Sequence, residues 1–123
     1  MDAAEQSVIA LVQAFNNALN ARDLDGMMRR MTADCVFENT DPPPDGARYA
    51  GQAAVRDYWE QFFRGSRECW IAAEEIFAAG PHCVMRWRYD WVGLDGTRGH
   101  VRGVDVYRIA DGLIAEKLSY VKG

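Results

Sequence analysis

The chain has 123 residues, which is about the length of one domain, since domains average roughly 150 residues. It carries 14 Lys and Arg against 18 Asp and Glu, and this net charge of −4 argues against a nucleic-acid-binding role. Hydrophobic residues make up 49% and charged residues 26%, the balance of a globular rather than a disordered protein. We therefore expect a single domain over residues 1–123.

The opening residues and the cysteines indicate a cytoplasmic protein. The N-terminus has no basic segment followed by an apolar one, so no signal peptide is predicted. No apolar run approaches the roughly 18 residues of a membrane span. Cys35, Cys69 and Cys83 are an odd set without C-x-x-C spacing, and we expect them to be reduced thiols in the core.

The first half of the chain is predicted to be mainly helical. Apolar residues from Val8 to Leu19 repeat at three- and four-residue spacing, which predicts an amphipathic helix over residues 3–21. Asp23 can cap a short second helix that carries Met31 near its end. The next elements are a strand over residues 35–39, a Pro-rich loop over 40–49 and a third helix over 52–64.

The second half is predicted to be all strand. The expected strands cover residues 70–78, 82–92, 100–109 and 113–121. Asp95 and Gly96 form the signal of a two-residue hairpin loop, and Asp111 with Gly112 marks the next turn. Helices followed by an antiparallel meander predict an α+β fold, with the helices on one face of a curved sheet.

The hairpin loop decides which side chains share a face of the sheet. With a two-residue loop, Arg86 lies opposite Asp105, and alternation places Arg88 and Asp90 on the same charged face. The opposite, aromatic face then carries Met85, Trp87, Tyr89, Trp91, Val104 and Val106. Either face can point inward: the aromatic face as core, or the charged face as the wall of a cavity.

Three segments resemble ketosteroid isomerases: residues 11–26, 33–39 and 104–112. Nearly the whole chain resembles the NTF2-like superfamily, including its SnoaL-like members. The resemblance implies a cone, in which three N-terminal helices pack on a curved, mostly antiparallel sheet around a pocket. Asp105 matches the aspartic acid that donates to the oxyanion in those isomerases. Asn39 stands at their general base and Phe15 at their oxyanion tyrosine, so steroid isomerisation itself is not expected.

A second resemblance is to limonene epoxide hydrolases, of the same superfamily. Arg88 and Asp90, separated by one residue, match an Arg–Asp pair whose aspartic acid protonates the epoxide there. Asn39 matches an asparagine that helps to hold the attacking water. Phe37 and Ser119 stand where those enzymes have a tyrosine and a final aspartate. Both resemblances bring charged residues into the cavity, which favours the charged face as its lining.

The sequence therefore predicts a small SnoaL-like enzyme with cofactor-independent acid/base chemistry on a largely apolar small molecule. The chemistry would be isomerisation, cyclisation, dehydration or epoxide-type ring opening; the alternative is a non-catalytic binding protein of the same fold. The expected catalytic residues are Asp105, Asp90, Arg88 and Asn39. The expected substrate-binding residues are Phe15, Phe37, Tyr58, Trp59, Arg86 and Ser119.

The remaining expectations concern metals, partners and charge. His82 and His100 are isolated from further ligands, so neither a metal nor a cofactor is expected. An aromatic face turned outward is too apolar for water, which predicts a homodimer through the sheet. Arg86, directly across from Asp105, is expected to keep that carboxyl ionised; the alternative is an apolar pocket, which would raise its pKa and make it a proton donor.

Overall fold

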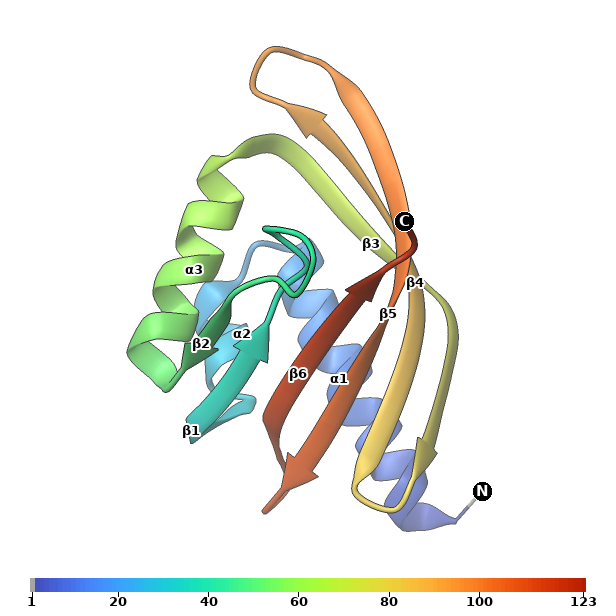
Figure 1. Cartoon of the computed structure of the whole chain (residues 1–123). Coiled ribbons are helices and arrows are strands. Elements are labelled where there is room, and N and C mark those ends of the chain that lie inside the picture. The colour runs from blue at the N-terminus through green and yellow to red at the C-terminus, as the bar shows by residue number, and fades with distance from the viewer. Residues whose placement is uncertain (1) are drawn as a thin grey trace.

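The computed structural model describes residues 2–123 as helices packed on one side of a six-stranded sheet (Figure 1). The helices are α1 (Ala3–Asn20), α2 (Leu24–Met28) and α3 (Gln52–Arg64). The strands are β1 (Met31–Glu38), β2 (Arg48–Ala50), β3 (Ser66–Ala79), β4 (His82–Gly93), β5 (Arg98–Ala110) and β6 (Leu113–Val121). The predicted α+β class is confirmed, and so are the helices and the β3–β6 meander.

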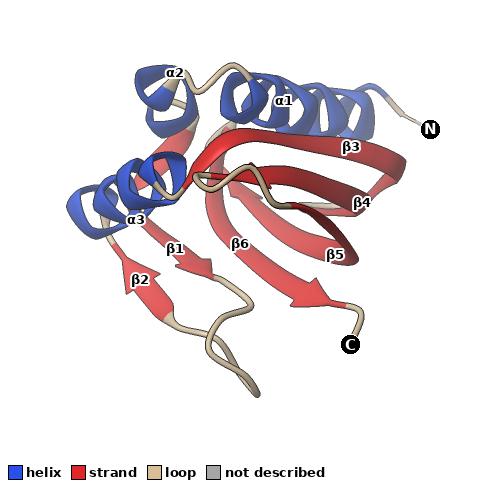
Figure 2. Ribbon diagram, turned by 90° about the horizontal axis from the view of Figure 1, so that it is seen from above, coloured by secondary structure: helices blue, strands red, loops and turns tan. Residues whose placement is uncertain are grey.

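The sheet is larger than predicted, because β1 and β2 extend it past β6. The strand order is β2-β1-β6-β5-β4-β3, and β1 runs parallel to β6 while the other neighbours are antiparallel. The sheet curves around the helices, as seen from above in Figure 2. Two assignments were wrong: Met31 begins β1 rather than ending a helix, and β2 begins in the last two residues of the predicted loop. Both depend on pairing between distant segments, which local periodicity does not report.

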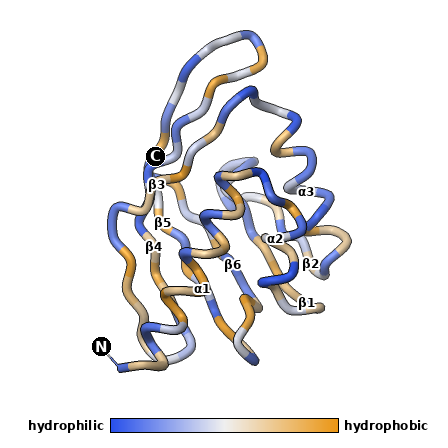
Figure 3. The backbone as a smooth tube through the Cα atoms, turned by 180° about the vertical axis from the view of Figure 1, so that it is seen from behind, coloured by the Kyte–Doolittle hydropathy of each residue, from blue (hydrophilic) through white to orange (hydrophobic). Residues whose placement is uncertain are grey.

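The long helices form where capping and amphipathic spacing coincide. Asp2 and Glu5 make a capping box at the start of α1, and the Asp23 side chain accepts from the Gly26 amide at the start of α2, as predicted. Hydrophobic and hydrophilic residues alternate along these elements (Figure 3). The apolar side of α1 is buried against the sheet, with Phe15 fully enclosed. None of the described helices is long and apolar enough to cross a membrane.

The β4–β5 hairpin has a three-residue loop rather than the predicted two-residue loop. The Gly96 amide donates to the Gly93 carbonyl at 2.9 Å, and the Gly93 amide donates to the Thr97 carbonyl at 2.7 Å. Gly96 has a φ of 86°, the left-handed conformation that closes this type of loop. The extra residue shifts the register by one, so Met85 rather than Arg86 lies opposite Asp105. The predicted register was therefore wrong.

The register shift places Asp105 on the aromatic face of β4, and this face points inward. Met85 and Trp87 are 1% and 7% exposed, and Asp105, at 3%, lies on the same inner face as these two residues. Because side chains alternate along a strand, the residues between them point to the opposite, outer face. The prediction that the charged face lines the cavity was wrong for Arg86, Arg88 and Asp90.

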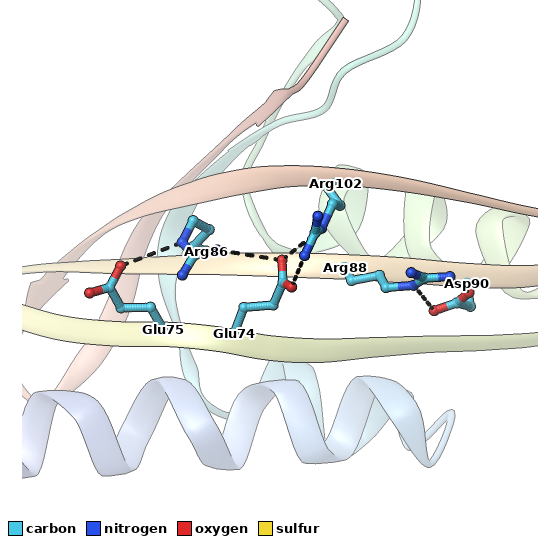
Figure 4. A network of polar contacts seen from close by, with 6 residues as sticks. All are labelled: Glu74, Glu75, Arg86, Arg88, Asp90 and Arg102. Atoms are coloured by element: carbon cyan, nitrogen blue, oxygen red, sulfur yellow. Dashed lines mark hydrogen bonds and ion pairs between the residues drawn. The ribbon is translucent and has the colours of Figure 1, made fainter.

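These charged residues form an ion-pair network on the outer face, across β3, β4 and β5 (Figure 4). Arg102 donates to Glu74, Arg86 lies 3.7 Å from the same carboxylate, and Arg88 Nε lies 2.9 Å from Asp90. The hydrogen bond from Arg102 lowers the pKa of Glu74, and the one from Arg88 lowers the pKa of Asp90. Solvent-exposed pairs of this kind contribute little to folding free energy.

Gly103 is predicted to be required for the inner face to pack. A Cβ added there would lie 2.6 Å from ring carbons of Trp87 and would also meet the backbone of Tyr120. We expect Gly103→Ala to lower the free energy of unfolding by about 1–3 kcal/mol, as overpacking does. Gly65→Ala is the control, because its Cβ would meet only carbonyls at 3.5 and 3.6 Å. Urea denaturation tests both, and equal stabilities for the two variants would contradict the prediction.

Candidate functional site

A cavity of about 80 Å³ lies between α3 and the inner face of the sheet. It is lined by Phe37, Asn39, Thr40, Tyr58, Trp59, Phe62, Ile71, Trp87, Tyr89, Asp105, Lys117 and Ser119. A second, more open hollow of about 460 Å³ shares Thr40, Phe62, Trp87 and Tyr89 with it. The space therefore has a narrow inner part and a wider outer part.

An ion pair occupies the polar side of this cavity. Lys117 Nζ lies 3.1 Å from Asp105 Oδ2, and the two side chains are only 5% and 4% exposed. The β5–β6 register brings them together, because Asp105 pairs with Ser119 and Tyr107 pairs with Lys117 on adjacent inner-face positions. The predicted partner of Asp105, Arg86, lies instead on the outer face, so that part of the prediction was wrong.

Two hydroxyl groups complete the shell around Asp105. Ser119 Oγ donates to Oδ1 at 2.6 Å, and the Tyr107 hydroxyl donates to Oδ2 at 3.2 Å. Burial and the adjacent Asp105 charge raise the pKa of Tyr107 well above its ordinary value, so that hydroxyl remains a donor. With Lys117, three of the roughly four acceptor positions of the carboxylate are filled. The free position is on Oδ1.

Lys117 is enclosed by aromatic rings. Its Nζ lies 4.7 Å from the centroid of Phe37, 5.3 Å from Trp59 and 5.9 Å from Tyr107. Rings at such distances attract a cation through their negative faces. Nζ also donates to Ser119 at 3.1 Å, so two of its three hydrogens have oxygen partners and one is left for a ligand.

Asn39 ties the Pro-rich loop to the cavity wall. Its side-chain Oδ1 accepts from the backbone N–H of Ala47 at 2.8 Å, and its backbone N–H donates to the Ala47 carbonyl at 3.1 Å. Burial raises the pKa of Tyr58, although the neighbouring Asn39 amide partly offsets this effect. Burial also raises the pKa of Tyr89 to about 12. Both cavity tyrosines are therefore hydrogen-bond donors at neutral pH.

The structure divides the predicted site residues into three groups. Six of them line the cavity: Phe37, Asn39, Tyr58, Trp59, Asp105 and Ser119. Phe15 is fully buried beneath it, where it packs edge-on against Tyr107 at 6.4 Å. The third group, Arg86, Arg88 and Asp90, lies on the outer face and does not contact the cavity.

Sequence reasoning missed Lys117, Tyr107 and Trp87 as site residues. Lys117 could have been found from its position two residues before Ser119, because residues two apart in a strand share a face of the sheet. The signal for Tyr107 was the same spacing from Asp105. Trp87 was placed on the outward face by the wrong hairpin register. Within residues 2–123, no group of three or more His, Cys, Asp or Glu residues could hold a metal ion.

The comparisons with known proteins agree with this architecture. Residues 12–117 match the SnoaL-like domain, and the curved sheet with its helices is the cone of NTF2-like proteins. The chain belongs to the SnoaL-like family. No curated protein matches the chain significantly.

Three solved structures illustrate the similarity. An NTF2-like protein of unknown function from Mesorhizobium loti is 35% identical, with a TM-score of 0.84, and the match covers 100% of this chain and 97% of that one. An LEH-like epoxide hydrolase from Mycobacterium tuberculosis is 20% identical, with a TM-score of 0.83 and coverage of 97% and 85%. A second protein from that organism, crystallised with estradiol-17beta-hemisuccinate, is 23% identical, with a TM-score of 0.81 and coverage of 93% and 92%. The last two show likeness of fold.

The buried ion pair is predicted to be strongly coupled. We expect Lys117→Met and Asp105→Asn each to cost about 3–5 kcal/mol in the free energy of unfolding, because each leaves a buried polar partner uncompensated. The double variant should lose less than the sum of the two, as in any coupled pair. Urea denaturation of the four proteins measures the coupling. Additive losses would contradict it, and Arg88→Ala, in an exposed pair, is the control with little expected loss.

Proposed function

We propose that the protein is an enzyme that moves a proton at a carbon next to a carbonyl group in a largely apolar small molecule, without a cofactor. The observation that carries the proposal is the buried Asp105–Lys117 ion pair at one side of an aromatic cavity. A carboxylate and an ammonium group held 3.1 Å apart can act on the same substrate, the first as a base and the second as a hydrogen-bond donor to a developing negative charge.

The electrostatics of the cavity favour an uncharged ligand. Asp105 and Lys117 are its only formally charged lining residues, and their charges cancel. The other walls are mainly aromatic, so an apolar ring system can displace the water. In such a site, fixed donors act more strongly on developing charge than they would in water.

Asp105 and Lys117 would divide the chemistry between them. The free acceptor position on Asp105 Oδ1 takes the proton from carbon, and the C–H electrons move into the carbonyl group to form an enolate. The remaining N–H of Lys117 donates to the enolate oxygen. Return of the proton to another carbon completes an isomerisation. Alternatively, the enolate carbon attacks a second carbonyl of the substrate to make a ring, and the alkoxide formed there takes the proton back from Asp105. Ser119 holds both groups in place.

Two relatives support an apolar substrate. One was crystallised with a steroid ester, estradiol-17beta-hemisuccinate, and another is an LEH-like epoxide hydrolase. Both share this cone at low sequence identity, so they support the class of ligand and the general acid/base character rather than a particular reaction.

A second candidate function is ligand binding without catalysis. Three donors already hold Asp105, and hydrogen bonds to a carboxylate weaken it as a base. Asn39, at the base position of the ketosteroid isomerases, uses its oxygen to hold Ala47. These two observations favour a binding protein, and the exchange experiment below separates the two functions.

We also propose a homodimer through the outer face of the sheet. The earlier reason for a dimer was wrong, since the aromatic face with Trp87 points inward. The outer face nevertheless exposes Trp70, Phe77 and Tyr120, which are 59%, 47% and 53% accessible. Exposed large apolar side chains on one face are typical of protein–protein contacts.

A reducing compartment, the cytoplasm, is the location that we propose. Cys35, Cys69 and Cys83 are free thiols and are buried, as predicted. Burial raises the pKa of the Cys83 thiol to about 11, which keeps it protonated and unreactive.

The enzyme hypothesis predicts accelerated hydrogen exchange at carbon. With β-tetralone in deuterium oxide, we expect the protein to accelerate deuterium uptake next to the carbonyl, and Asp105→Asn to reduce this acceleration by about two to four orders of magnitude. Proton NMR follows the exchange under conditions where circular dichroism shows the variant folded. Arg88→Ala, on the outer face, should exchange as the wild type does. Undiminished exchange by Asp105→Asn would contradict the proposal, and β-tetralone bound without any acceleration would establish the binding protein.

The dimer hypothesis predicts a mass of twice 13.8 kDa in light scattering at micromolar concentration. Tyr120→Asp should shift the protein toward the monomer, because it replaces an exposed aromatic ring of the outer face with an unpaired charge. Leu94→Asp is the matched control, since Leu94 is 67% exposed at the hairpin loop, away from that face. A monomeric wild type would refute the dimer.

A further inference from the structure

Two tryptophans on the inner face of β4 lie directly opposite two glycines of β5. The register pairs Trp87 with Gly103 and Trp91 with Gly99. A Cβ added at Gly99 would lie 2.7 Å from one ring carbon of Trp91 and closer still to another. The Trp91 indole therefore occupies the position that a side chain at residue 99 would take, and its ring lies across the bare backbone of β5.

The two glycines are required for different reasons. At Gly103, an added Cβ would meet the backbone carbonyl of Tyr120 as well as the Trp87 ring. That glycine therefore permits a close approach of two strands, which is a requirement of the fold. At Gly99, the three nearest heavy atoms all belong to the Trp91 ring. A side chain there would meet another side chain, which can move, and no backbone.

The space into which Trp91 would move belongs to the candidate site. Trp91 lines the open hollow of about 460 Å³ together with Phe62, Tyr89 and Val101, and we call this space the outer hollow. The ring centroids of Trp91 and Tyr89 are 5.2 Å apart, so Tyr89 limits movement along β4. A side chain at residue 99 points to the same inner face as the indole and would lift the ring off the sheet. The lifted ring would reduce the room in the outer hollow.

The outer hollow decides how long a ligand can be. One water needs about 10–15 Å³ measured in this way, so the inner cavity of about 80 Å³ holds about five to eight non-hydrogen atoms. That is about one ring, next to Asp105 and Lys117. Every further ring of a bound molecule lies in the outer hollow, where Trp91 forms part of the wall.

We propose that Gly99 is a specificity residue that sets the length of ligand admitted to the site. Its missing side chain lets Trp91 lie across β5 and keeps the outer hollow open, whereas a side chain at this position restricts the site to shorter molecules. The inference rests on the proposed function, because it takes the cavity to be the ligand site. Gly99 acts through Trp91 on the far end of the ligand, while Asp105 and Lys117 act on the near end.

The test compares β-tetralone with a β-tetralone that carries a phenyl group on its aromatic ring, at the end far from the ketone. Because the added ring enters an apolar hollow, we expect the wild type to bind the phenyl compound about ten- to one-hundred-fold more tightly. Gly99→Ala should abolish this preference and leave the affinity for β-tetralone nearly unchanged. Isothermal titration calorimetry measures the affinities, and circular dichroism shows whether the variant is folded.

A double variant separates displacement of the indole from general damage to the sheet. When Trp91→Leu is added to Gly99→Ala, the shorter side chain leaves room beside the new Cβ, so the preference for the phenyl compound should return. Arg98→Ala is the matched control and should keep the full preference. Arg98 precedes Gly99 on β5, is exposed, and points to the outer face.

A full preference in the folded Gly99→Ala variant would overturn the inference, as would a double variant that does not regain the preference. Equal affinities of the two compounds for the wild type, or binding of neither, would also overturn it, and this comparison needs no variant. A preference that depends on Gly99, found without deuterium exchange at β-tetralone, would support the inference and refute the enzyme hypothesis. Accelerated exchange together with a full preference in Gly99→Ala would do the reverse.

Discussion

The buried ion pair between Asp105 and Lys117 imposes the strictest constraint on this fold. Two charges removed from water are tolerated only when each has close partners, because their mutual attraction alone does not offset the loss of hydration. Here Tyr107 and Ser119 supply the remaining hydrogen bonds, and aromatic rings surround the ammonium group. All four polar residues come from two adjacent strands, so the β5–β6 register positions the entire cluster.

The aromatic wall of α3 follows from the same constraint. Trp59, Tyr58 and Phe62 cover the ion pair from the helical side, and Phe37, which pairs with Lys117 from the adjacent strand β1, covers it from the side. A polar side chain at one of these positions would admit water and weaken the electrostatic effect of Lys117 on a ligand. The cavity is therefore apolar on most sides, with its polar groups gathered around one ion pair.

Local patterns predicted most of the fold. The error with the largest effect on the site came from the length of the β4–β5 hairpin loop. The helices and the β3–β6 meander follow from apolar periodicity and capping, which are short-range signals. The hairpin at Gly93–Thr97 depends on whether two or three residues close it, and the sequence Leu-Asp-Gly fits either loop. One residue of difference exchanged the two faces of β4 relative to β5, so Arg86 and Asp90 were predicted inside and lie outside.

The candidate site was partly predictable for a different reason. The resemblance to ketosteroid isomerases and epoxide hydrolases correctly predicted that Asp105, Asn39 and Ser119 line the cavity, because aligned positions keep their place in the fold even when their neighbours change. It did not reveal Lys117, since a lysine in a strand is most often a solvated charge and is seen as a partner only once the β5–β6 register is known. That lysine changes the meaning of the resemblance. Where a ketosteroid isomerase keeps a neutral acid that donates to the substrate, this chain places a carboxyl 3.1 Å from the Lys117 ammonium group. In the proposed function Lys117 takes the donor role, and the side-chain oxygen of Asn39 holds the loop at Ala47 instead of acting as a base.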